Sequence, residues 1–209
     1  MEQILSKKQP CLQVFLDNVH SSQNLSAIIR SCEGVGVLDV HYTTPINESL
    51  KIHKTITQGA HRWTHRYRVD SKDKVRFIEE KKLQGFQIVV THLSEASCSF
   101  RQIDYTKPTL IVVGNEKEGV SLEIVKQADH TIVIPMQGMV QSLNVSVATA
   151  LVLYEAQRQR EEANMYEKSL LSVTHQKEIT NAWIYRDTIA RPSKGTIALE
   201  FQEKVYFSK

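Results

Sequence analysis

The 209-residue sequence has little glycine and proline, 8 and 5 residues, which excludes collagen-like and linker-dominated chains. It has no run approaching the roughly 18 apolar residues that a membrane-spanning helix needs. Its N-terminal segment is too polar for a signal peptide. Hydrophobic residues make up 41% and charged residues 23%, which is typical of a globular chain with its own core. These features predict a soluble cytoplasmic protein without a membrane partner.

Cysteine is scarce as well. The three cysteines, Cys11, Cys32 and Cys98, are odd in number and form no CxxC pair, so neither a disulfide framework nor a zinc site is expected. We interpret them as small buried side chains. His61 and His65 are four residues apart, but no third ligand accompanies them, so no metal site is predicted.

Common nucleotide and hydrolase fingerprints are also missing. No GxGxxG, GxSxG or HExxH pattern occurs in the chain. The spacing from Gly114 to Gly119 is that of a P-loop, but Val120 and Ser121 follow where such a loop needs Lys and Ser or Thr. These absences argue against a nucleotide-dependent α/β enzyme and against a serine hydrolase.

Apolar strands alternate along the chain with amphipathic helices. The Val/Ile runs are typical of strands covered on both faces, as in a parallel sheet. The fold class predicted is therefore α/β with a mostly parallel sheet. We expect strands at 12–16, 39–43, 86–91, 109–114 and 130–135. We expect helices at about 25–34, 51–56, 71–83, after the N-cap Ser121, at 143–160 and at 176–189, followed by a loosely packed tail.

The helix expected at 143–160 carries Leu143, Val147, Ala150, Leu151 and Tyr154 on one apolar face. Ser142 immediately precedes it and could serve simply as its N-cap. A capping role for Ser142 does not explain why other polar residues lie close to it in the sequence, namely Gln137, Gln141 and Asn144.

Positive charge concentrates in the segment 51–68, which has five Lys or Arg, three His and no acid. Trp63 and Tyr67 lie among these charges. Because Lys and Arg contact phosphates while aromatic rings stack on bases, the segment favours nucleic-acid binding. Two smaller basic clusters fit a solvated surface equally well, namely Arg158 with Arg160, and Arg186 with Arg191 and Lys194.

Three polar clusters follow expected strands, at the edge of the sheet where open α/β proteins bind ligands. The first contains Asn24 and Arg30, the second is VVGNEKEGVS at 112–121, and the third begins at Ile134 with IPMQGMVQSLNV. Each cluster has an ordinary structural explanation when it is taken alone. Arg30, for example, lies beside the apolar face of its own helix and could simply extend to solvent.

In this order and at these spacings, the segments 24–37, 113–121 and 134–160 resemble the three motifs of the SpoU family of RNA 2′-O-methyltransferases. The resemblance covers about 9–166, leaving 1–8 as a truncated N-terminal helix and 167–209 as a helical extension and tail. It implies an α/β knot, in which the C-terminal part of the domain forms a deep trefoil. It also implies a homodimer with active sites at the interface.

The resemblance further implies S-adenosylmethionine as the cofactor and tRNA as the partner. Within the family, the stretches 91–109 and 138–160 most resemble members that methylate guanosine 18 of the tRNA D-loop. One alternative is a 2′-O-methyltransferase for another tRNA position or for ribosomal RNA, which would carry the same motifs. Another is an RNA-binding protein that kept the knot fold without catalysis, although the intact motif residues speak against it.

Roles for individual residues come from the same resemblance. The expected catalytic residues are Arg30, Asn24, Glu116, Ser142 and Asn144. The expected cofactor-binding residues are Thr91, Leu93, Gly114, Ile134, Met136, Ser142 and Leu143. RNA binding is expected from Lys54, Arg62, Arg66, Arg68 and Arg158, and no metal is expected. Because a guanidinium stays protonated in proteins, we expect Arg30 to stabilise the developing alkoxide while an RNA phosphate or a water accepts the proton.

Overall fold

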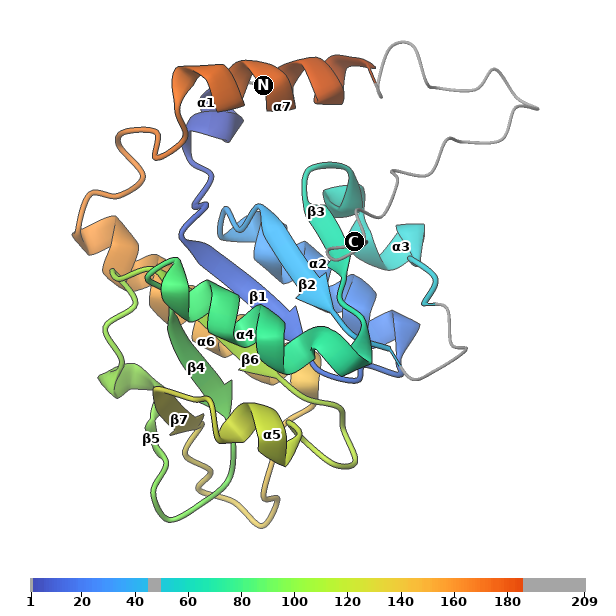
Figure 1. Cartoon of the computed structure of the whole chain (residues 1–209), viewed down its shortest axis with the longest axis vertical. Coiled ribbons are helices and arrows are strands. Elements are labelled where there is room, and N and C mark those ends of the chain that lie inside the picture. The colour runs from blue at the N-terminus through green and yellow to red at the C-terminus, as the bar shows by residue number, and fades with distance from the viewer. Residues whose placement is uncertain (1, 45–49, 186–209) are drawn as a thin grey trace.

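The computed structural model describes residues 2–44 and 50–185 (Figure 1). The basic cluster of Arg186, Arg191 and Lys194 and the last part of the helix expected at 176–189 therefore lie outside the described residues. The core of the fold is a seven-stranded sheet with the order β3-β2-β1-β6-β4-β7-β5, and all the neighbouring strands are parallel. The predicted α/β class with a parallel sheet is confirmed.

The strands are β1 (Leu12–Leu16), β2 (Asp39–Tyr42), β3 (His65–Arg68), β4 (Gln87–Thr91), β5 (Cys98–Ser99), β6 (Thr109–Val113) and β7 (His130–Val133). The α-helices are α1 (Glu2–Ser6), α2 (Ser22–Gly34), α3 (Lys54–Thr57), α4 (Lys74–Leu83), α5 (Leu122–Val125), α6 (Val145–Glu162) and α7 (Val173–Ile184). Short 3₁₀ turns occupy Ala60–Arg62, Ser71–Asp73 and Phe100–Gln102. None of the helices among the described residues is long and apolar enough to cross a membrane.

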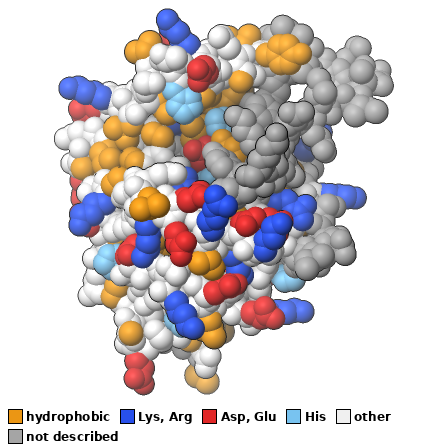
Figure 2. Space-filling view, in the orientation of Figure 1, with side chains coloured by type: hydrophobic (Ala, Val, Ile, Leu, Met, Phe, Trp, Pro, Cys, Tyr) orange, Lys and Arg blue, Asp and Glu red, His pale blue; other side chains and the backbone are white. Residues whose placement is uncertain are grey.

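Helices cover both faces of the sheet, so alternate residues of one strand enter different cores. Ile111 and Val113 of β6 belong to a buried cluster that includes residues of α2 and α6. Leu110 and Val112 belong to another cluster, with residues of α4 and α5. This arrangement explains why the central strands are apolar at most positions and not only at alternate ones. On the face over which α4 lies, acidic and basic side chains are interspersed (Figure 2).

A third apolar cluster joins the terminal helices to the rest of the molecule. Leu5 of α1 and Ile179 and Trp183 of α7 are buried with Leu38 and Leu171. In Figure 1, α1 and α7 lie together at the top of the molecule.

The predicted strands are confirmed to within two residues at their ends, whereas β3 and β5 were not predicted. The helix after the first strand is confirmed, with Ser21 as its N-cap. The short helix expected at 51–56 lies at Lys54–Thr57. The helix expected from Ser71 begins as a 3₁₀ turn and becomes α-helical at Lys74. The terminal helix begins at Val173, three residues earlier than expected, because Ser172 caps it.

The long helix α6 differs from expectation in two ways. It begins at Val145, because the side chain of Asn144, and not that of Ser142, accepts from the backbone N–H of Ser146 and caps it. The apolar face that the sequence predicted is partly exposed, with Val147, Leu151 and Tyr154 retaining 47%, 41% and 54% of their accessible surface. The core side of α6 is instead formed by Thr149, Val152, Leu153, Ala156 and Arg160.

Candidate active site

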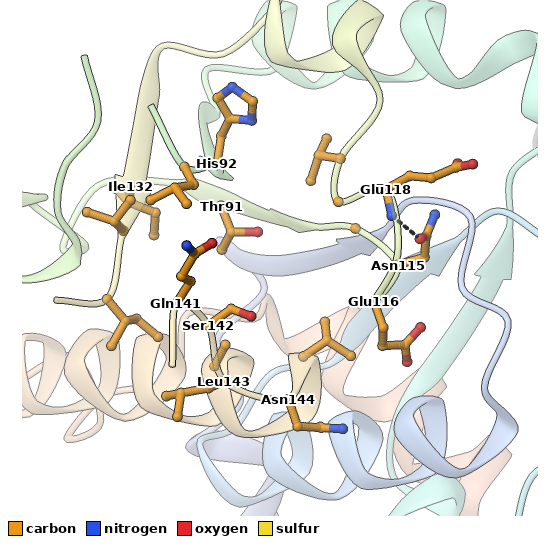
Figure 3. A pocket seen from close by; sticks show the side chains of 18 of the residues that line it. Thr91, His92, Asn115, Glu116, Glu118, Ile132, Gln141, Ser142, Leu143 and Asn144 are labelled. Atoms are coloured by element: carbon orange, nitrogen blue, oxygen red, sulfur yellow. Dashed lines mark hydrogen bonds between the residues drawn. The ribbon is translucent and has the colours of Figure 1, made fainter. Parts of the chain in front are cut away.

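A cavity of about 660 Å³ opens where the loops after β4, β6 and β7 meet (Figure 3). This is the carboxyl edge of a parallel sheet, where open α/β proteins bind ligands, and the volume suits a small organic molecule. Glu116 and Asn144 line the cavity, as do all the residues predicted to bind cofactor, which are Thr91, Leu93, Gly114, Ile134, Met136, Ser142 and Leu143.

The loop after β6 folds back on itself and forms one wall of the cavity. The backbone N–H of Gly119 donates to the carbonyl of Asn115 at 3.0 Å, and that of Asn115 donates to the carbonyl of Gly119 at 3.2 Å. The buried side-chain oxygen of Asn115 accepts from the backbone N–H groups of Lys117 and Glu118 at 2.9 and 2.8 Å. These bonds close a tight turn that holds Glu116 exposed beside the cavity.

Gly114 is required by this turn. A Cβ placed there would lie 1.9 Å from the carbonyl carbon of Gly119 and 2.2 Å from the nitrogen of Val120. Both are backbone atoms, so any side chain at position 114 would push the two arms of the turn apart.

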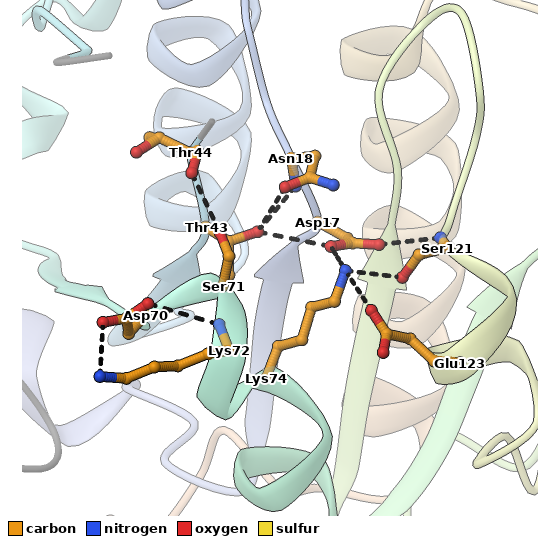
Figure 4. Close-up of polar contacts among 10 residues, drawn as sticks. All are labelled: Asp17, Asn18, Thr43, Thr44, Asp70, Ser71, Lys72, Lys74, Ser121 and Glu123. Carbon is orange, nitrogen blue, oxygen red and sulfur yellow. Dashed lines mark hydrogen bonds and ion pairs between the residues drawn. The ribbon is translucent and has the colours of Figure 1, made fainter. Parts of the chain in front are cut away.

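A buried polar network fixes the other end of the same loop (Figure 4). Asp17, at the end of β1, accepts from the backbone N–H of Ser121 at 2.8 Å. The ammonium of Lys74 donates to the hydroxyl of Ser121 at 3.0 Å and pairs with Asp17 and Glu123 at 3.4 and 2.8 Å. Burial acts to lower the pKa of Lys74, but the hydrogen bond to Glu123 and the charge of Asp17 outweigh it and raise the pKa, so the ammonium stays charged.

The three polar clusters of the sequence meet beside the cavity. The amide nitrogen of Asn24, on α2, donates to the carboxylate of Glu116. The amide nitrogen of Asn144 donates to the oxygen of Asn24 at 3.3 Å, and the oxygen of Asn144 accepts from the backbone N–H of Ser146 at 2.8 Å. Each amide therefore has one orientation, and the chain of bonds connects α2, the loop after β6 and the start of α6. Ser142 is exposed on the cavity wall two residues before Asn144.

Arg30 is not part of this cavity wall. It lies six residues, or about 1.7 turns, further along α2 than Asn24, and its guanidinium donates to the carbonyl of Ile56 at 3.3 Å. There it lines a second cavity, of about 370 Å³, together with Glu33, Trp63 and Trp183. Within one copy of the chain, the structure thus brings together four of the five predicted catalytic residues and leaves Arg30 apart.

Four of the five predicted RNA-binding residues lie in or near the edge strand β3. Arg66 and Arg68 are two residues apart on β3, so their side chains leave the same face of the strand. The guanidinium of Arg62 lies 5.2 Å from the centre of the Trp63 ring. Lys54 is exposed on α3.

The two arginines at the end of α6, Arg158 and Arg160, do not form a positively charged surface. Arg158 is exposed on α6, but its guanidinium pairs with Glu155 and Glu162 at 2.8 and 2.6 Å. Arg160 is fully buried and donates to the carbonyls of Tyr105, Lys107 and Cys11 and to the side chain of Gln9. Treating Arg160 as a solvated or binding residue was wrong, because its charge is used to satisfy backbone carbonyls inside the protein.

Sequence reasoning assigned no role to two polar residues of the cavity, although Asn115 belongs to the second polar cluster. His92 and Asn115 line the cavity, and each directly follows a strand or its terminal glycine. Their position at the strand ends was the available signal, but nothing in their spacing distinguished them from ordinary loop residues. The prediction that all three cysteines are buried holds for Cys32 but was wrong for Cys11 and Cys98, which are partly exposed. In the ranges 2–44 and 50–185, no group of three or more His, Cys, Asp or Glu is placed to hold a metal ion.

Comparison with known proteins identifies the family of this chain and a relative of nearly full length. Residues 11–154 match the SpoU rRNA Methylase family. The chain is 52% identical over 189 residues to the tRNA (guanosine(18)-2′-O)-methyltransferase of Aquifex aeolicus, covering 90% of this chain and 89% of that protein.

Solved structures agree with the sequence comparison. The crystal structure of the A. aeolicus TrmH/SpoU tRNA modifying enzyme superposes with a TM-score of 0.86 at 52% identity, covering 90% of this chain and 94% of the other. The AdoMet-bound rRNA methyltransferase from Sinorhizobium meliloti superposes with a TM-score of 0.65 at 29% identity, covering 82% of this chain and 61% of the other.

Proposed function

Because this chain belongs to the SpoU rRNA Methylase family, we propose that it transfers a methyl group from S-adenosylmethionine to the 2′-hydroxyl of guanosine 18 in tRNA. The observation that carries the proposal is the meeting of the three motif segments, through Asn24, Glu116 and Asn144, at a single cavity. Guanosine 18 is favoured over another tRNA position or ribosomal RNA because the chain is 52% identical, over 90% of its length, to an enzyme named for that target.

The cavity fits S-adenosylmethionine in size and in chemistry. Its volume of about 660 Å³ lies within the range for small-molecule sites. Ile132 and Leu143 offer apolar walls for an adenine ring, and the carboxylate of Glu116 offers negative charge to a cation. When bound, the cofactor supplies a methyl group on a positively charged sulfur. A family member in its AdoMet-bound form supports this assignment.

The polar residues around the cavity would orient the reacting ribose. Asn24 and Asn144 fix the position of Glu116, and Ser142 offers a hydroxyl on the same wall. Holding two reactants at attack distance removes much of the entropic part of a barrier. The ribose hydroxyl is a weak nucleophile until its proton leaves, and an RNA phosphate or a water would accept that proton because a guanidinium stays protonated. A guanidinium beside it stabilises the developing alkoxide, and this is the role we assign to Arg30.

Arg30 would reach the proposed cofactor cavity from a second copy of the chain. In one copy it faces a different cavity from that of Figure 3. The partly exposed face of α6, formed by Val147, Leu151 and Tyr154, adjoins Ala148 on the wall of the proposed cofactor cavity. An apolar face in this position is suited to contact with a second copy. We therefore infer a homodimer in which Arg30 of one copy completes the site of the other.

The tRNA backbone would lie against the β3 edge. Arg66, Arg68, Arg62 and Lys54 supply positive charge there, and Trp63 supplies an aromatic ring. Arg158, although predicted to bind RNA, is a weaker candidate because Glu155 and Glu162 already neutralise it. Such an enzyme would act in the compartment that holds tRNA, the cytoplasm.

We also propose the trefoil knot that the resemblance implies. The chain leaves β7, which lies two strands beyond β6, and returns so that Asn144 contacts Asn24 at the start of α2. A connection of this kind, passing the ends of β4 and β6, supports threading of 134–160 through the preceding loops. A crystal structure with the backbone traced through this region is the test. A chain that ran outside those loops would overturn the knot and leave the proposed reaction intact.

The reaction is tested by incubating the protein with labelled S-adenosylmethionine and unmodified tRNA transcripts, then mapping the product. The expected product is 2′-O-methylguanosine at position 18, and a transcript with a 2′-deoxy nucleotide at that position is the matched control. A label at another ribose, or on ribosomal RNA only, would keep the chemistry and discard the target. Cofactor binding without transfer to any RNA would favour an RNA-binding protein.

A further inference from the structure

The cavity beside Arg30 is built from parts of the chain that are distant in sequence. It has a volume of about 370 Å³, and residues from α1, α2, α3, the 3₁₀ turn Ala60–Arg62 and its C-cap, and α7 line it. Ile4 and Trp183, from the terminal helices, form one part of its wall. Both residues lie outside the family match at 11–154. The cavity therefore combines the shared methyltransferase domain with segments that the family as a whole does not define.

Two aromatic rings give this cavity planar walls. Trp63 and Trp183 contact each other edge to face, with ring centres 5.1 Å apart. Trp183 is fully buried in the third apolar cluster, whereas Trp63 is only partly buried and carries the guanidinium of Arg62 over its ring. Proteins recognise unstacked RNA bases by placing them against aromatic rings and guanidinium planes of this kind.

A carboxylate gives the cavity a preference among bases. Glu33 lines the cavity with 28% of its side chain exposed, and the buried ammonium of Lys8 holds it at 3.6 Å. A carboxylate accepts two hydrogen bonds side by side. Guanine presents two neighbouring donors on its Watson–Crick edge, the N1–H and the 2-amino group. Adenine and the pyrimidines do not present such a pair, so a carboxylate at this position favours guanine.

We infer that this cavity receives the guanine base of the target nucleotide while the ribose of that nucleotide faces Arg30. The inference rests on the proposed function. Arg30 and Glu33 are three residues apart on α2, which places them on one face and about 4.5 Å apart along the helix axis. That separation suits a single nucleoside, with its sugar at Arg30 and its base edge at Glu33. The terminal helices would thereby contribute to the choice of base.

Tryptophan fluorescence tests the cavity without requiring catalysis. The chain contains two tryptophans, and both line this cavity, so their emission reports on its contents. An RNA hairpin with the D-loop sequence should quench the emission when it carries guanosine at the target position. The same hairpin carrying inosine, which lacks the 2-amino group, should bind about tenfold more weakly. Equal quenching and equal affinity for the two hairpins would overturn the inference.

Methyl-transfer kinetics identify the residue that reads the base. For the unaltered protein, kcat/KM should be about tenfold lower on tRNA with inosine at position 18 than on tRNA with guanosine. In Glu33→Gln the preference should fall to about twofold or less, because the amide has one acceptor in place of two. Glu79→Gln, an exposed glutamate on α4, is the matched control and should keep the tenfold preference.

A Glu33→Gln protein that loses activity on both substrates equally, with the preference unchanged, would reduce Glu33 to a structural partner of Lys8 and overturn the inference. Should this variant fail to fold, Trp63→Ala provides the second test. It should weaken binding of the guanosine hairpin about tenfold and leave the KM for S-adenosylmethionine unchanged. Unaltered hairpin affinity would exclude the cavity as the base site. Absence of 2′-O-methylguanosine from every tRNA product of the unaltered protein would instead overturn the proposed function.

Discussion

At the scale of single residues, Asn24 and Arg30 lie on the same helix, α2, but contribute to different cavities. Asn24 hydrogen-bonds to both other motif segments at the larger cavity. Arg30 reaches across to Ile56 and lines the smaller one. The two residues therefore make separable contributions, and substitutions at each should have different signatures.

Arg30→Ala is expected to reduce methyl transfer about 100- to 1,000-fold, because removing one donor to a developing oxyanion has an effect of that size. Binding of S-adenosylmethionine should stay within twofold, since the walls of the proposed cofactor cavity form without Arg30 and its proposed role in the dimer is toward the ribose and not the cofactor. Single-turnover transfer and calorimetric titration measure the two quantities. Loss of cofactor binding in a folded variant would mean that Arg30 maintains the cavity and does not act on the ribose.

Gly114→Ala is expected to distort the turn after β6, because the added Cβ would lie 1.9 Å from a backbone carbon of Gly119. Overpacking against backbone should lower the free energy of unfolding by about 2 kcal/mol or more and abolish cofactor binding. Gly138→Ala is the matched control, since a Cβ there meets no atom within 4 Å. Thermal unfolding and cofactor titration compare the two, and equal behaviour would show that the turn adapts.

At the scale of elements, α6 shows how one helix carries the same residue type in two roles. Arg160 is buried and bonds to carbonyls of Tyr105, Lys107 and Cys11, whereas Arg158 is exposed among acids. Arg160→Met is expected to cost about 3 kcal/mol in the free energy of unfolding, because several buried acceptors lose their donor. Arg158→Met should leave it nearly unchanged. Chemical denaturation measures both, and similar losses would contradict the assignment.

The strand β2 contains a histidine that should make the fold sensitive to acid. Burial, together with the positive charge of Lys81, lowers the pKa of His41 to about 3. The unfolded chain takes up this proton near pH 6.5, before the folded chain does. The contribution of His41 to the free energy of unfolding is therefore fully present above pH 6.5. It falls by about 1.4 kcal/mol for each pH unit as the pH drops from 6.5 toward 3.

Replacing this histidine should remove that part of the pH dependence. The His41→Gln variant is expected to have a shallower fall in the free energy of unfolding between pH 6.5 and 4.5 than the unaltered protein. His175→Gln, at an exposed position on α7, serves as the control and should keep the full slope. Denaturant titrations at a series of pH values measure the free energy of unfolding of each variant and hence its pH dependence. An unchanged slope in His41→Gln would assign the acid sensitivity to other groups.

The elements that could be predicted from the sequence are those whose own residues form a recognisable apolar pattern. The strands β1, β4, β6 and β7 are mainly apolar runs, and a cavity opens after β4, β6 and β7, at the sheet edge where ligand binding was predicted. The strand β3 has the sequence HRYR, which carries no apolar run, and only its pairing with β2 makes it a strand. Ser142 and Asn144 are equally good caps by residue type, and the contact of Asn144 with α2 decides between them. The separation of Arg30 from the cavity is likewise a tertiary property that no spacing reveals.

At the scale of the whole molecule, the two faces of the sheet differ in what they leave exposed. The α4 face presents mixed charges (Figure 2), whereas α6 presents an apolar stripe beside the proposed cofactor cavity. This asymmetry is the basis for expecting a dimer that forms through α6.

Leu151→Lys is expected to convert the proposed dimer to a monomer, because it places a charge in the centre of that stripe. Sedimentation should change from about twice the chain mass of 23.9 kDa to that mass, and methyl transfer should fall with it. Leu83→Lys, on α4 and 88% exposed, is the control and should remain dimeric. An unaltered protein that sediments as a monomer would contradict the expectation directly.

The packing of α1 against α7 has a consequence for biosynthesis. Leu5 and Trp183 share one apolar cluster, yet 178 residues separate them along the chain. At ordinary rates of synthesis, roughly 10 to 35 seconds pass between the emergence of the first and that of the second from the ribosome. During that interval α1 has no partner from α7, and the small cavity beside Arg30 lacks Trp183 from its wall. A nascent chain could thus complete its sheet before it acquires the surface that we assign to choosing the base.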